Sequence, residues 1–177
     1  MATHVQVTQF QDEAYKHILA EMNSKDDLTF RVGDTLDMKA SILLAAITLL
    51  ATQVFYFLDK RQAGLAYYLL LVSAVLLAGA TVAAFLELRP RKYIIPIPEK
   101  SGIDRAAELK RFYSQHEGVE VETMMAEFTK DQMGWAQSRI STNMDINKTK
   151  ADWLERSFYL TACAMILNII ALFMRLF

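Results

Sequence analysis

Three long runs of uncharged, mostly apolar residues restrict what this chain can fold into. They cover Ala40–Leu58, Ala63–Leu86 and Ser157–Phe177, and the only charge inside them is Arg175, near the end of the third run. As a helix, the first run is roughly 28 Å long, about the thickness of the hydrocarbon layer of a bilayer. A soluble chain of 177 residues has no core that could bury three such runs. We therefore predict three transmembrane helices.

The distribution of Lys and Arg predicts how these helices are oriented. Only Asp59-Lys60-Arg61-Gln62 connects the first two runs, so they form a tight antiparallel hairpin. Of the basic residues, four lie in 1–39 and twelve in 87–156, whereas the hairpin turn holds two and the C-terminal end one. By the positive-inside rule, the N-terminus and the middle segment are expected in the cytoplasm, and the C-terminus outside.

The remaining sequence predicts helices on the cytoplasmic side. Apolar residues recur there at spacings of three and four, which is typical of amphipathic helices. We expect a helix break at 23–27, where N-cap residues cluster, another near Gly118, and a helix end before Pro90. The fold class is an all-α membrane protein with three transmembrane helices and helical cytoplasmic extensions of the first and third spans. The predicted segments are N-terminal cytoplasmic helices (1–38), a transmembrane hairpin (39–88), a cytoplasmic helical region (89–156) and a third transmembrane helix (157–177).

Two amides inside the spans need partners, because an unpaired amide in lipid is unfavourable. They are Gln53 in the first span and Asn168 in the third. One interpretation is that each bonds across a helix interface within one subunit. The other is that they line a pore formed by several subunits.

Polar side chains concentrate where the first and third spans leave the membrane on the cytoplasmic side. Spacings of three and four place them on shared helix faces. The first stretch contains Arg31, Asp34, Asp37, Lys39 and Ser41, and the second contains Arg139, Asn143, Asn147 and Lys150, with Lys148 beside them. If the two helices pack side by side, Arg and Lys could hold a phosphate, and Asn, Asp and Ser a base or ribose. Alternatively, Lys39 only anchors its helix, Asp37 pairs with Arg31 or a lysine, and the asparagines bond between helices.

Several function classes find no support in the residues. No Gly-rich phosphate loop, nucleophile–base pair or metal cluster is recognisable, so the chain is not expected to be an enzyme or to hold a metal. The three histidines are far apart, and the single cysteine, Cys163, lies inside an apolar run. The net charge of −1 gives no reason to expect a nucleic-acid partner. Few charged residues lie within the spans, which argues against a constitutive channel or transporter.

Three motifs resemble the Pycsar transmembrane effector family, whose anti-phage system uses a pyrimidine cyclase to make a cyclic nucleotide messenger. DTLDMKASILL (34–44) is similar to the family's signature at the first span. LELRPRKY (86–93) resembles its exit from the second span, and NMDINKTKADWLERSFYL (143–160) resembles the helix that leads into its last span. Small membrane effectors of the SLATT type are also similar.

The resemblance implies an anti-phage effector of the bacterial inner membrane. A separate cyclase would supply cyclic UMP or cyclic CMP, which would be the ligand; no other cofactor is expected. The spans would then homo-oligomerise or rearrange, disrupt the bilayer, and cause growth arrest or death of the infected cell. The ligand-binding residues it implies are Arg31, Asp37, Lys39, Asn147 and Lys148. Of these, Lys39 or Lys148 would face the phosphate, and Asp37 and Asn147 would read the base or ribose, or hold the cationic side chains in place. The alternative is a membrane-anchored scaffold that binds a partner protein and has no nucleotide ligand.

Overall fold

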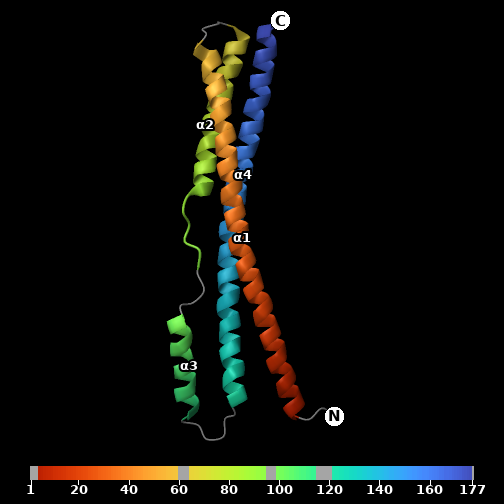
Figure 1. Ribbon diagram of the computed structural model, residues 1–177, viewed down its shortest axis with the longest axis vertical. Helices are drawn as coiled ribbons and strands as arrows, with labels where there is room; N and C mark the ends of the chain where they lie inside the picture. The colour runs from red at the N-terminus through yellow and green to blue at the C-terminus, as the bar shows by residue number, and fades with distance from the viewer. Residues whose placement is uncertain (1–3, 60–63, 95–98, 115–120, 177) are drawn as a thin grey trace. The chain divides into compact units, whose positions relative to one another are not determined.

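The computed structural model describes residues 4–59, 64–94, 99–114 and 121–176. Within these ranges the chain forms four helices and no strand: α1 (His4–Asp59), α2 (Leu65–Leu88), α3 (Glu99–Ser114) and α4 (Val121–Leu176) (Figure 1). Three of them, α1, α2 and α4, are long and apolar enough to cross a membrane. The predicted fold class is confirmed: an all-α membrane protein in which the first and third spans continue as long helices.

The predicted break at 23–27 is wrong, because α1 passes through it without interruption. The candidate N-cap residue Asp26 uses its carboxylate for a distant arginine, Arg139, instead of capping a helix locally. The hydroxyl of Thr29 donates to the carbonyl of Asp26 within the helix. By contrast, α2 does end at Leu88, before Pro90, as predicted. The break expected near Gly118 lies outside the described residues.

The chain divides into two compact units. We call Val32–Arg91 with Ile146–Phe177 the membrane unit, because it contains the three apolar spans. We call Met1–Arg31 with Lys92–Asp145 the polar unit.

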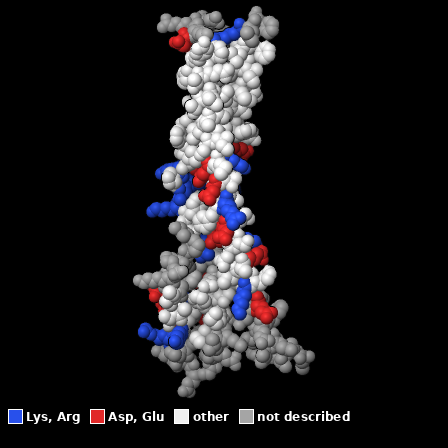
Figure 2. Space-filling model, viewed as in Figure 1, with Lys and Arg blue, Asp and Glu red and all other residues white. Residues whose placement is uncertain are grey.

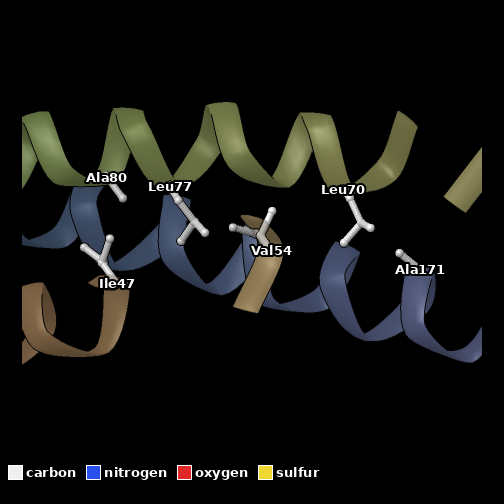
Figure 3. Packing of buried hydrophobic residues seen from close by; sticks show 7 residues of the cluster. Ile47, Val54, Leu70, Leu77, Ala80 and Ala171 are labelled. Carbon is white, nitrogen blue, oxygen red and sulfur yellow. The ribbon is translucent and has the colours of Figure 1, made fainter. Parts of the chain in front are cut away.

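Buried positions in the membrane unit recur every seven residues. In α1 they include Ala40, Ile47 and Val54. In α4 they include Lys150, Ser157, Ala164 and Ala171, and in α2 two such series interleave: Leu70, Leu77 and Ala84 with Ser73, Ala80 and Glu87. A strict seven-residue repeat produces left-handed, coiled-coil-like packing. Figure 3 shows side chains of all three helices meeting in one apolar core.

Two serines join α2 to α4 inside this core. Ser73 of α2 donates to the carbonyl of Ala164 on α4 over 2.9 Å, and Ser157 of α4 donates to the carbonyl of Ala80 on α2 over 2.8 Å. Small residues at these positions allow the two backbones to approach closely. Each hydroxyl is thus satisfied without water, as a hydrocarbon environment requires.

The outward surface of the spans is apolar. Leu49 of α1 is 74% exposed and Val75 of α2 is 71% exposed. In Figure 2 the visible face of the spans carries no charge between the charged groups at its two ends. A continuous apolar surface of this size suits contact with lipid rather than with water. We refer to the end of the membrane unit near Asp37, Glu87 and Lys150 as its polar end.

In the polar unit, ionic and hydrogen-bonded contacts link segments far apart in sequence. Arg139 of α4 pairs with Asp26 of α1 over 3.1 Å, and both side chains are buried. Arg105 of α3 pairs with Asp131 of α4 over 2.9 Å at the surface, and this hydrogen bond raises the pKa of Arg105.

A side-chain amide holds the segment that follows α2. Asn143 of α4 is fully buried; its Nδ2 donates to the carbonyl of Ile94, and its Oδ1 accepts from the amide N–H of the same residue. Tyr93 also packs against Phe30 of α1, with ring centroids 5.7 Å apart.

Candidate functional site

Three charged residues near the polar end interact, one from each helix of the membrane unit, and we call them the charged layer: Asp37 of α1, Glu87 of α2 and Lys150 of α4. The Lys150 ammonium donates a hydrogen bond to Asp37, and the Lys150 side chain is only 4% exposed. Glu87 and Lys150 occupy the same seven-residue register as the apolar core, which explains why such polar side chains are buried.

Glu87 is the unusual member of the charged layer. It is fully buried, and neither carboxylate oxygen accepts a hydrogen bond from a described donor. Asp37, Lys150 and Arg91 act on it electrostatically. The cluster contains two acids and a single buried lysine, so Lys150 is central to its charge balance.

A groove of about 520 Å³ lies beside the charged layer, between α1 and α4 of the membrane unit. Its walls are mostly apolar and carry two charged side chains, Lys39 and Glu155. Both are exposed, and within the described part of the chain neither forms an ion pair or a side-chain hydrogen bond. The apolar lining consists of Leu36, Ile42, Leu43, Ala46, Ala151, Leu154, Phe158 and Tyr159.

The five predicted ligand-binding residues occupy different environments. Asp37 belongs to the charged layer, where it pairs with Lys150. This contact agrees with the alternative expectation that Asp37 pairs with a lysine. Lys39 lines the groove, Asn147 is buried, and Lys148 is exposed on α4. Arg31 is an exposed residue of the polar unit. Their joint role in binding a ligand stays a prediction.

Three residues of this region were not among the predicted binding residues: Lys150, Glu87 and Glu155. The seven-residue register gives a signal for two of them, because Lys150 precedes Ser157 by seven positions and Glu87 follows Ala80 by seven. Nothing in the sequence pattern distinguishes Glu155 from an ordinary exposed glutamate.

The groove can offer a ligand two kinds of contact. The Lys39 ammonium is available to an anion, and the Glu155 carboxylate is available to a hydroxyl or N–H donor. The apolar walls between them suit a flat ring. No group of three or more potential metal ligands occurs in the described part of the chain.

Comparison with known proteins gives one match. The family model of the Pycsar effector protein domain matches residues 30–177, which include the whole membrane unit. Searches of curated proteins and of solved structures found no match. The family match covers all three spans, the charged layer and the groove. The chain therefore belongs to the Pycsar effector family, the membrane effectors of an anti-phage defence system.

Proposed function

We propose that this effector is switched on by a cyclic pyrimidine nucleotide, cyclic UMP or cyclic CMP, made by a separate cyclase. The ligand binds at the polar end of the membrane unit, which faces the cytoplasm of the bacterial cell. The observation that carries the proposal is the groove between α1 and α4, with Lys39 and Glu155 on its walls. The family match supports the same conclusion, because Pycsar effectors respond to a cyclase.

The groove suits the chemistry of a cyclic mononucleotide. Its volume of about 520 Å³ lies within the usual range for small-molecule sites. Lys39 meets the single negative charge of the cyclic phosphate, and Glu155 accepts from the ribose hydroxyl or a base N–H. Phe158 and Tyr159 provide aromatic surface for the pyrimidine ring.

Other predicted binding residues of the membrane unit add polar contacts to this position. Lys148 precedes Ala151 by three residues and Glu155 by seven, so it lies on the face of α4 that lines the groove and adds a second positive charge. The Asp37 side chain is 42% exposed despite its bond to Lys150, so part of its carboxylate can still read the ligand. We retain Asn147 as a further contact of the bound nucleotide, whereas Arg31, a residue of the polar unit, stays a prediction from the sequence.

Ligand binding here acts directly on the spans. Both walls of the groove belong to helices that cross the membrane, and the bond between Asp37 and Lys150 connects the same two helices. A ligand that fits one spacing of α1 and α4 better than another shifts the population toward that spacing. The spans then assemble as a homo-oligomer, the inner membrane loses integrity, and the infected cell stops growing or dies.

Direct binding tests this proposal. Cyclic UMP, cyclic CMP and cyclic dinucleotides are titrated against the full chain in detergent by calorimetry. We expect binding of a cyclic pyrimidine mononucleotide. The change Lys39→Ala removes one charge-assisted hydrogen bond, worth about 1.5–3 kcal/mol, and weakens binding roughly 10- to 150-fold.

The matched control is Arg89→Ala, which removes an exposed positive charge from the segment after α2, outside the groove. It should leave the affinity unchanged. Failure of every nucleotide to bind would overturn the proposal. Equal losses for Lys39→Ala and Arg89→Ala would show that the groove is not the site.

A further inference from the structure

Two amides inside the spans, Gln53 and Asn168, share a hydrogen bond, but each keeps one polar atom without a described partner. Gln53 lies in the apolar part of α1 and is exposed on the surface of the membrane unit. Its Oε1 accepts a long hydrogen bond of 3.5 Å from Nδ2 of Asn168 on α4. Its own Nε2 donates to no described residue.

An amide donor that faces hydrocarbon has no solvent to bond with, and leaving it unpaired is costly. The neighbouring hydroxyls do not share this problem. Thr48 and Thr52 are also exposed, but each donates over 2.9 Å to the carbonyl four residues earlier in α1. Oδ1 of Asn168 also lacks a partner, but Asn168 is buried, whereas Gln53 is exposed, so Nε2 of Gln53 is the unsatisfied group that a second chain can reach.

The surface around Gln53 forms a continuous apolar stripe. Ile42, Leu49 and Tyr56 are exposed and lie seven residues apart, and Gln53 lies four residues after Leu49 and three before Tyr56. We call these four residues the Gln53 face. A seven-residue apolar repeat of this kind is the pattern that packs against another helix.

We propose that the Gln53 face is the surface through which two copies of this chain associate in the membrane. A carboxamide is self-complementary, because it carries both a donor and an acceptor. Around a two-fold axis along the membrane normal, each Gln53 Nε2 donates to Oε1 of the other copy, and one isologous contact satisfies both amides. Lipid chains offer no such partner.

The apolar stripe favours a second copy over water. A water-filled pore along this face would wet Ile42 and Leu49, whereas a second helix covers them and pairs Gln53 at the same time. This self-association deepens the proposed function, which needs assembled spans. It can be tested without any nucleotide.

Disulfide cross-linking in native membranes tests the proposal. The full chain carries Cys163→Ser, which removes its only cysteine. A single new cysteine is placed at Leu49 on the Gln53 face or, as the matched control, at Val75, which is equally exposed on α2. We expect oxidation to give dimers for Leu49→Cys and not for Val75→Cys.

Adding Gln53→Leu to the Leu49→Cys chain should lower the dimer fraction. An interhelical hydrogen bond in a membrane contributes about 0.6–1.7 kcal/mol, and the change removes both bonds of the pair, so association should weaken roughly 8- to 300-fold. Equal cross-linking at Leu49 and Val75, or no effect of Gln53→Leu, would overturn the proposal. Reaction of Gln53→Cys with a water-soluble maleimide would also overturn it, because the face would then line water.

These outcomes separate the two proposals. If Leu49→Cys cross-links but no nucleotide binds, the nucleotide-gated function falls and the Gln53 contact stands. If a nucleotide binds but Leu49→Cys gives no dimer with or without it, the Gln53 contact falls alone.

Discussion

Replacing Lys150 tests the account of the charged layer most sharply. The change Lys150→Met keeps the length of the side chain and removes its charge, so Asp37 and Glu87 are left together without their buried cation. Breaking a buried ion pair costs about 3–5 kcal/mol. The Asp37 side chain is 42% exposed and can regain water, so we expect a smaller loss of about 2–3 kcal/mol in the free energy of unfolding.

The assay is unfolding of the detergent-solubilised chain by added sodium dodecyl sulfate, followed by helical circular dichroism. Lys148→Met is the matched control, because it makes the same change at an exposed position two residues away. Its effect should stay within about 0.5 kcal/mol. If both variants lose the same stability, Lys150 does not hold the charged layer together.

Replacing Glu87 should change the free energy of unfolding in the opposite direction in the same assay. Glu87→Gln keeps the size of the side chain and removes a buried acidic group that no described donor satisfies. We expect a gain of about 1–2 kcal/mol. Combined with Lys150→Met, it should recover part of the lost stability, because the remaining Asp37 no longer faces a second carboxylate. Strictly additive effects would contradict the contact between these residues.

Two further predictions concern the polar unit. Arg139→Met leaves Asp26 without its buried partner and should lower the free energy of unfolding by about 3–5 kcal/mol. Arg105→Met breaks a surface pair and should lower it by only about 0.2–1 kcal/mol. Similar losses for the two variants in the denaturation assay would contradict the assigned burial. Asn143→Leu removes both hydrogen bonds to the backbone of Ile94, so hydrogen–deuterium exchange should be faster at the Ile94 amide, and an unchanged rate would show that this contact does not hold the segment.

The spans could be predicted because their signal is local. Uncharged runs of membrane length have few alternatives to a transmembrane helix, and Pro90 marks the end of α2 in the sequence itself. The helix break predicted at 23–27 was wrong, although its signal was equally local. The continuation of α1 through these residues involves a contact with a residue far away in the sequence. Asp26 is a good capping residue, yet its carboxylate is engaged by Arg139, 113 positions later, and this partner is not visible from helix-capping rules.

The candidate site, too, could be predicted only in part from local sequence patterns. Spacing within each helix placed Asp37 and Lys150 in the polar stretches at the ends of their spans. It could not give the register of α1 against α4, and that register decides that Asp37 bonds to Lys150 while Lys39 lines the groove. The burial of Glu87 depends on all three helices, so no single stretch of sequence predicts it.

Dye release from liposomes tests the central claim most directly. Liposomes that contain the full chain are loaded with a self-quenching dye and exposed to cyclic UMP, cyclic CMP or a cyclic dinucleotide. We predict saturable release with a cyclic pyrimidine mononucleotide. Lys39→Ala should shift it to higher nucleotide concentration, and Arg89→Ala should leave it unchanged. If none of these nucleotides releases dye from liposomes that contain folded protein, this chain is not a nucleotide-gated membrane effector.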